Sequence, residues 1–172
     1  MTVAPKLISI SGSIHAGKTT ISRMLAVSMP NAFYIDGDLI ATWTTVQNSF
    51  KNVPIDEKLP QIHTKIIELI DVGLRDGTDV IIDYPLSDNT RQQIIDSLKN
   101  IKFEAKWFLL KPDIAKVLAG SNTRPKLTDW EIERIHYHYE KSDLLKTAFA
   151  TVIDSTKQTP EETVESIRDL II

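Results

Sequence analysis

The chain has 172 residues, of which 42% are hydrophobic and 25% are charged, and its formal net charge is -3. This length suits a single domain over residues 1–172, and no apolar stretch approaches the ~20 residues needed to span a bilayer. The charge balance argues against extensive nucleic-acid binding, although a local groove could take a short end, and the lack of cysteine excludes disulfides, thiolate metal sites and thiol nucleophiles. Because the first residues carry no signal-peptide pattern, we expect a cytoplasmic protein with no membrane segment.

A glycine-rich loop follows the first predicted strand, residues 7–10. Residues 12–19 read GSIHAGKT and fit the phosphate-loop pattern GxxxxGK[ST], and the apolar residues after them recur at helical spacing. A strand, this loop and a helix in succession bind the phosphates of a nucleoside triphosphate. We expect the binding residues to be Gly12, Ser13, Ile14, His15, Ala16, Gly17, Lys18, Thr19 and Thr20.

Each residue type in the loop has a physical reason. The glycines let the backbone curl so that successive N–H groups point at phosphate oxygens, and the helix start adds partial positive charge. Lys18 can reach the β and γ phosphates, and the Thr19 hydroxyl is a typical Mg²⁺ ligand. The alternative is an ordinary glycine-rich turn that happens to carry a lysine, which the flanking strand and helix disfavour.

Acidic residues follow the second and third predicted strands. Residues 32–35 form a short apolar run that ends in Asp36-Gly37-Asp38, and residues 80–82 form another that ends in Asp83. Ligands of open parallel sheets bind beyond the carboxyl ends of the strands, so we expect all three carboxylates near the phosphate loop. The alternative in both places is a turn with solvated carboxylates.

The remaining pattern alternates helices with strands. Residues 39–59 predict a partly helical lobe over the site, and Pro60 fits the first turn of a helix that runs to Arg75. The later helices are expected over residues 88–98, from Pro112 onward, from the capping box at Thr128 to about Lys146, and after a second capping box at Thr159. Strands are expected over residues 103–110 and 151–154. His136 and His138 are expected to be solvated residues of the long helix, since they lie two positions apart and point to different faces. Five strands alternating with helices indicate an α/β fold with a parallel sheet covered on both faces.

These motifs together resemble the small P-loop kinases, a group that includes shikimate and gluconate kinases, chloramphenicol phosphotransferase, nucleoside kinases and polynucleotide kinase. The resemblance covers nearly the whole chain. It implies a three-layer P-loop NTPase fold with strand order 2-3-1-4-5, a short lid over approximately residues 120–135, and the turn after the last strand beside adenine. The stretch from Asp83 to Asp88, with Arg91, is most similar to the polynucleotide-kinase and antibiotic-kinase branch.

The resemblance also implies a reaction, which is in-line transfer of the γ-phosphoryl group of ATP to a hydroxyl. Lys18 and Mg²⁺ would neutralise the phosphates, Asp38 would take the hydroxyl proton, and Arg124 would close with the lid onto the developing charge. The expected metal-site residues are Thr19, Asp36 and Asp83. Asp36 and Asp38 could exchange roles, because the sequence does not fix which side chain points where.

The acceptor is expected to be small and neutral. No arginine occurs between Met24 and Leu74, although anionic acceptors are usually gripped by guanidinium groups. The same segment offers neutral groups suited to a polyol, nucleoside or antibiotic-like molecule, namely Thr42, Trp43, Thr44, Thr45, Gln47, Asn48 and Phe50.

Other functions stay open at this point. One is a nucleoside or polynucleotide 5'-hydroxyl kinase, and another is a non-catalytic ATP-binding protein. A regulatory GTPase is excluded because the chain contains no DxxG switch and no NKxD. We expect a monomer or a homodimer.

Overall fold

The computed structural model describes residues 3–29, 31–46, 54–120 and 125–171. At its centre lies a sheet of five parallel strands in the order β2-β3-β1-β4-β5, which confirms the expected topology. The strands are β1 (Lys6–Gly12), β2 (Phe33–Asp36), β3 (Val80–Asp83), β4 (Glu104–Leu110) and β5 (Thr151–Ile153).

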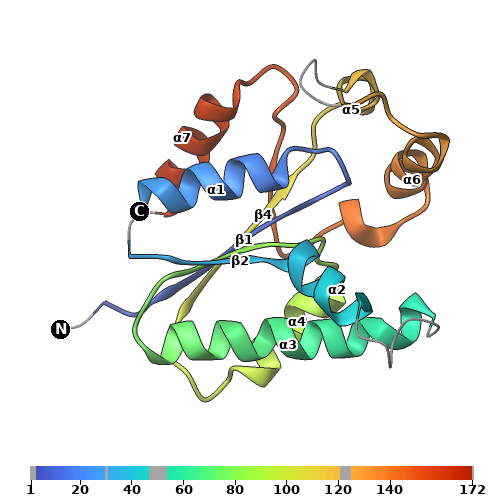
Figure 1. The fold of residues 1–172 in the computed structure, drawn as a ribbon. Coiled ribbons are helices and arrows are strands. Elements are labelled where there is room, and N and C mark those ends of the chain that lie inside the picture. The colour runs from blue at the N-terminus through green and yellow to red at the C-terminus, as the bar shows by residue number, and fades with distance from the viewer. Residues whose placement is uncertain (1–2, 30, 47–53, 121–124, 172) are drawn as a thin grey trace.

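Helices cover both faces of this sheet, as Figure 1 shows. On one face lie α1 (Lys18–Ser28) and α7 (Pro160–Ile171), whose buried side chains, such as Leu25 and Ile167, pack with Ile8 and Ile10 of β1. On the other lie α3 (Ile55–Arg75) and α4 (Asp88–Ser97), whose core includes Ile66. The runs of apolar residues in the strands are therefore buried on both sides, which is typical of a parallel sheet.

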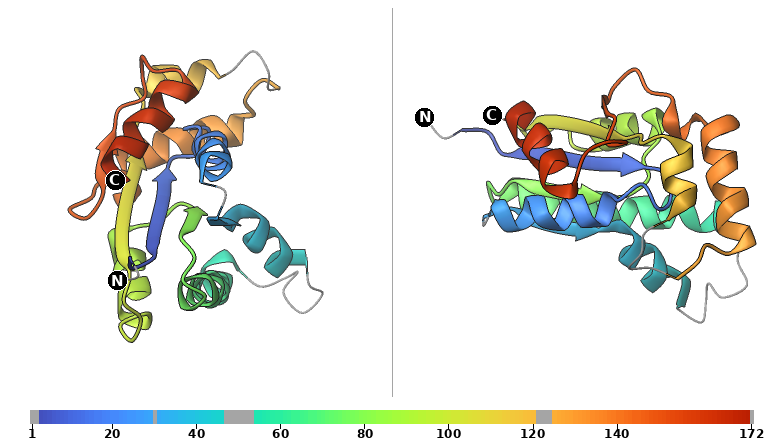
Figure 2. Two further views of the ribbon diagram at one scale, coloured as in Figure 1. Left: turned by 90° about the vertical axis from the view of Figure 1, so that its left-hand side faces the viewer. Right: turned by 90° about the horizontal axis from the view of Figure 1, so that it is seen from above.

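The remaining helices gather at the carboxyl ends of the strands. They are α2 (Gly37–Val46), α5 (Ile114–Ala119), α6 (Asp129–Glu140) and the short 3-10 helix η2 (Asp143–Leu145). Figure 2 shows β1 running toward α5 and α6, while both chain termini lie at the opposite end of the sheet. The described helices include none that is long and apolar enough to cross a membrane.

Two helix boundaries differ clearly from the expected ones. The helix expected to begin at Pro60 begins at Ile55, and Pro60 lies inside it. A proline there costs a backbone hydrogen bond, but a fully buried isoleucine stripe, Ile62, Ile66 and Ile70, anchors the helix to the sheet.

The helix expected to reach about Lys146 ends at Glu140 instead. Ser142 begins a separate turn there, because its Oγ accepts a hydrogen bond from the Leu144 N–H at 3.1 Å. A serine that satisfies a free N–H in this way favours a new helix start over continuation of the old one.

Candidate active site

The phosphate loop joins the end of β1 to the start of α1. Gly12 has φ 152°, and a Cβ on it would lie 2.6 Å from the backbone oxygen of Leu110, so only glycine fits there. Gly17 precedes α1 with φ 94° and offers no side-chain cap. The first N–H groups of α1 are therefore left to bind an anion, as the loop pattern predicts.

Six predicted site residues line one cavity. It has a volume of about 190 Å³ and is lined by Ile14, His15, Gly17, Lys18, Thr19 and Asp38. The Lys18 side chain is buried, with 6% of its surface exposed, and its Nζ donates to the Ser13 backbone oxygen at 3.0 Å. A buried ammonium group beside a cavity that also carries a carboxylate is a site built for charged chemistry.

The structure shows different surroundings for Asp36 and Asp38, whose roles the sequence left interchangeable. One oxygen of Asp36 accepts from the Leu39 N–H at 3.0 Å and the other pairs with Arg23 at 3.3 Å. Asp36 thus holds the first turn of α2, whereas Asp38, in that turn, lines the cavity beside Lys18.

Asp83 is the most deeply buried of the three carboxylates, with 1% of its surface exposed. The described residues provide no hydrogen bond to either of its carboxylate oxygens. Burial raises the pKa of Asp83, the nearby Thr19 hydroxyl and Lys18 ammonium group lower it, and the charges of Asp38 and Asp36 raise it again. A buried carboxylate whose oxygens accept no hydrogen bond is expected where a cation binds.

These residues fit a magnesium ion. Thr19 and Asp83 offer hard oxygen ligands next to the phosphate loop, which is the ligand type that Mg²⁺ prefers. Within the described part of the chain, no three His, Asp or Glu side chains are grouped closely enough to hold a metal by themselves. Mg²⁺ in phosphoryl-transfer sites is bound by one or two carboxylates together with the substrate phosphates, where it neutralises their charge.

The Tyr84 ring packs against the turn that carries Asp38. Gly37 lets Tyr84 approach closely, since a Cβ on Gly37 would lie 2.5 Å from the Tyr84 ring. Burial and the charge of Asp38 raise the pKa of Tyr84 to about 12. The His63 ring meets Tyr84 edge to face at a centroid distance of 5.9 Å, and burial lowers the pKa of His63. Both rings are therefore neutral at physiological pH. The sequence did not point to His63, whose pattern showed only that it lies beside the buried stripe of α3.

Arg91 belongs to a buried polar cluster at the start of α4. Its side chain is fully buried and its Nη1 donates to Asp88 at 2.6 Å and to Thr147 at 3.3 Å. Asp88 also accepts from the Ala148 N–H at 2.8 Å. This cluster ties the start of α4 to the segment before β5.

Two histidines connect the phosphate loop to α6. His138 is buried, and its Nδ1 lies 3.0 Å from the Ser13 Oγ, so the expectation that it is a solvated helix residue is wrong. Burial, with smaller contributions from Arg134 and Lys18, lowers the pKa of His138 to about 4. His15 pairs with Glu131 at 2.9 Å. Because residues 131 and 138 lie seven apart on one helix face, α6 holds the loop at both ends of that face.

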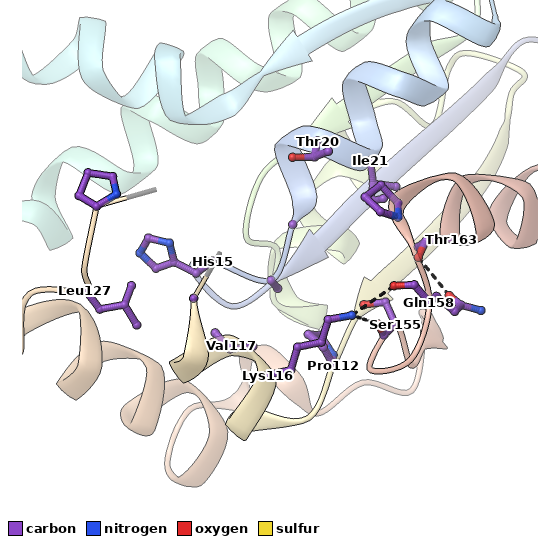
Figure 3. A pocket seen from close by; sticks show the side chains of 15 residues that line it. His15, Thr20, Ile21, Pro112, Lys116, Val117, Leu127, Ser155, Gln158 and Thr163 are labelled. Carbon is purple, nitrogen blue, oxygen red and sulfur yellow. Dashed lines mark hydrogen bonds between the residues drawn. The ribbon is translucent and has the colours of Figure 1, made fainter. Parts of the chain in front are cut away.

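A second cavity adjoins the first at the phosphate loop. It has a volume of about 430 Å³ and lies between α1, α5 and the turn that follows β5 (Figure 3). His15 and Gly17 line both cavities, so the two adjoin at the phosphate loop. The apolar part of its lining comes from Ala16, Ile21, Pro112, Val117, Pro125, Leu127 and Pro160.

Some predicted site residues lie outside the described part of the chain. They are Arg124, the expected lid arginine, and Gln47, Asn48 and Phe50 of the expected acceptor segment. The side chains of Trp43, Thr44 and Thr45 are likewise not described.

Comparison with known proteins gives a consistent picture of the fold. No family model and no curated protein matches the sequence. Solved structures do match: the tunicamycin resistance protein of Deinococcus radiodurans (18% identity, TM-score 0.66, 97% of this chain and 95% of that one) and a gluconokinase from Sinorhizobium meliloti (14%, 0.68, 97% and 94%). Kti12 of Chaetomium thermophilum, solved with ADP-AlF3, matches at 15% identity and a TM-score of 0.66, covering 96% of both chains.

The chain has the fold of the small P-loop kinases. The strand order and the helices on both faces agree with those neighbours, as the resemblance implied. At these identities the likeness concerns the P-loop kinase fold alone, so the chemistry has to be argued from the cavities described above.

Proposed function

We propose that this protein is an ATP-dependent phosphotransferase that moves the γ-phosphoryl group to a hydroxyl of a small, neutral acceptor. One observation carries the proposal: Lys18, Thr19 and Asp38 line a single cavity that adjoins a larger pocket across the phosphate loop. A nucleotide with its base in the larger pocket and its phosphates along the loop would carry its γ-phosphate toward Asp38.

The residues around this cavity suit each part of the reaction. The acceptor oxygen attacks the γ-phosphorus, the bond from that phosphorus to the bridging oxygen of ADP breaks, and Asp38 takes the hydroxyl proton. Lys18 stabilises the negative charge on the phosphates, while Thr19 and Asp83 would hold Mg²⁺. Asp36 is less suited to either role because both of its carboxylate oxygens are engaged.

The described residues near Asp38 support a neutral acceptor. Tyr84 packs against the turn that carries Asp38 and contacts His63, both rings are neutral, and the fully buried Arg91 is paired with Asp88. A carboxylate or phosphate on the acceptor would place a second negative charge near Asp38 without a guanidinium group from these residues to balance it.

Transfer of labelled γ-phosphate from ATP tests the proposal. The acceptor panel consists of matched pairs, nucleoside against nucleoside monophosphate and sugar against sugar acid, with 5'-hydroxyl oligonucleotides as a further class. We expect transfer to a neutral member, and we expect Asp38→Asn to bind ATP with wild-type affinity while turnover falls at least a hundredfold.

The alternatives give different results in the same assay. A clear preference for anionic members would overturn the neutral acceptor, and transfer to oligonucleotide ends would favour a polynucleotide kinase. Tight ATP binding with slow hydrolysis that no acceptor stimulates would indicate a non-catalytic ATP-binding protein. Full turnover of Asp38→Asn would remove Asp38 from its role as the base.

A further inference from the structure

A lysine lies at the edge of the pocket in which the proposed nucleotide would place its base. Lys116 belongs to α5, and its ammonium group reaches across to the turn after β5 (Figure 3). There its Nζ donates to the Ser155 backbone oxygen and, at 3.2 Å, to the Gln158 backbone oxygen. Both acceptors belong to residues that line the same pocket as Lys116.

These two hydrogen bonds alter the donors and acceptors that the pocket edge presents to a base. An ammonium group has three donor hydrogens, and two of them are used by these carbonyls. The third finds no hydrogen-bond partner among the described residues and remains available at the pocket edge. Both carbonyl oxygens, which could accept hydrogen bonds from a ligand, already bond a charged donor, and the positive charge beside them disfavours the approach of another donor.

The Gln158 side chain of this turn is held by α7. Gln158 accepts from the Thr163 hydroxyl at 3.1 Å through its side-chain oxygen, and its side-chain nitrogen donates to Ser166 at 3.3 Å. The amide is therefore held in place by α7 and is not free to turn toward a ligand. Lys116 is the charged donor at this edge.

Purine bases differ at the edge that such a group would meet. Adenine carries an exocyclic amine, which needs an acceptor, whereas guanine carries a keto oxygen, which needs a donor. A site that selects adenine presents a carbonyl to the amine. Here an ammonium group bonds both carbonyls and places a positively charged donor beside them, which suits a keto oxygen better than an amine.

We propose that Lys116 sets the base preference of this site, so that it accepts GTP about as well as ATP. The inference rests on the proposed function, because it places the base of a nucleoside triphosphate in the 430 Å³ pocket. It goes further by naming the residue that reads the base and the chemical group that it reads. Removal of Lys116 frees the carbonyls for an exocyclic amine and turns the preference toward ATP.

Calorimetric titration of the full chain with Mg-ATP, Mg-GTP and tripolyphosphate tests this. For the wild type we expect a GTP dissociation constant no more than about threefold weaker than that of ATP. In Lys116→Met we expect the ratio of the two constants to move toward ATP by about tenfold or more, the usual effect of one charged hydrogen bond. Tripolyphosphate, which has no base, should bind both proteins alike.

Two further variants test whether the change in the ratio of the two dissociation constants is specific to Lys116. Lys116→Arg keeps a cationic donor and should retain the wild-type ratio. Lys111→Met removes a nearby lysine that also donates to a backbone oxygen, that of Leu145 at 3.4 Å, but does not line the pocket, so the ratio should not change.

Each other outcome overturns the inference. A wild type that prefers ATP more than about threefold contradicts it even if Lys116→Met does not fold. So does a folded Lys116→Met variant with an unchanged ratio, or one whose tripolyphosphate affinity falls as much as its GTP affinity. If none of the three ligands binds the wild type, the proposed function fails as well, which distinguishes that case from failure of the base assignment alone.

Discussion

At the scale of single residues, burial changes the pKa values of polar groups at this site. The Asp83 carboxylate lies fully inside the protein without a hydrogen bond from the described residues, and its pKa is raised chiefly by burial. The folded state therefore disfavours its charged form, and this cost is present above the raised pKa and disappears as the pH falls through it. Such groups are retained where they serve binding or catalysis.

We therefore expect Asp83→Asn to stabilise the ligand-free protein and to abolish transfer. The amide carries no charge to bury, so the free energy of unfolding at pH 7 should rise by on the order of 1 kcal/mol. Urea unfolding and labelled-phosphate transfer measure the two effects. Asp36→Asn is the matched control and should lower stability instead, because Asp36 pairs with Arg23 and holds the Leu39 N–H. A less stable and fully active Asp83→Asn variant would contradict this assignment.

His138 makes the stability of the protein depend on pH in the opposite sense. Its pKa of about 4 lies below the value of about 6.5 in an unfolded chain, so the unfolded state binds the proton more tightly. Its contribution is fully present above pH 6.5 and is lost as the pH falls toward 4, which amounts to about 2 kcal/mol between pH 7 and pH 5.

The test compares the wild type with His138→Gln, whose amide keeps a hydrogen-bonding group near Ser13 but does not titrate. We expect the wild type to lose about 2 kcal/mol more than the variant between pH 7 and pH 5 in urea unfolding. Parallel pH profiles for the two proteins would show that His138 is not held neutral by burial.

At the scale of elements, α6 acts as a clamp on the phosphate loop. Its capping box is complete, since Thr128 accepts from the Glu131 N–H while the Glu131 carboxylate accepts from the Thr128 N–H at 2.7 Å. The same carboxylate pairs with His15. Glu131, which completes the capping box, thus also contacts the phosphate loop, so a change in the cap should alter the proposed nucleotide site.

Thr128→Ala is therefore expected to cost about 1 kcal/mol of stability and also to weaken ATP binding severalfold. The physical reason is that Glu131 loses the hydroxyl that helps to fix its position beside His15. Ser87→Ala removes a cap from α4, where Ser87 accepts from the Thr90 N–H, and should cost similar stability without changing ATP affinity. Thermal unfolding and calorimetry decide between them, and an equal affinity in both variants would argue against the clamp.

At the scale of the whole molecule, the parallel sheet brings distant segments to one edge. The phosphate loop, Asp38 and Asp83 all follow carboxyl ends of strands, and this much could be predicted from local patterns. The contact between Ser13 and His138 could not, because it joins residues 125 apart and depends on how α6 docks. The distinct orientations of Asp36 and Asp38 were equally hidden, since both residues stand in one short turn.

The fold itself was predictable for a physical reason, and some boundaries were not. Alternating apolar runs and helical periods predict a parallel sheet covered on both faces, whereas the order of its strands was implied by the resemblance to the small P-loop kinases. Pro60 was misleading because its local preference for a first turn is outweighed by the burial of the isoleucine stripe that follows it. Tertiary packing decided that boundary.

The central claim, that the loop from Gly12 to Thr19 binds the phosphates of a nucleoside triphosphate, is tested most directly by calorimetric titration of Mg-ATP into the wild type and Lys18→Ala. The account predicts saturable binding to the wild type and an affinity at least tenfold weaker in the variant, because the variant lacks the buried ammonium group that meets the phosphates. Thermal unfolding of both proteins confirms that the variant is folded. An unchanged affinity in a folded Lys18→Ala variant, or no binding to the wild type, would contradict the account.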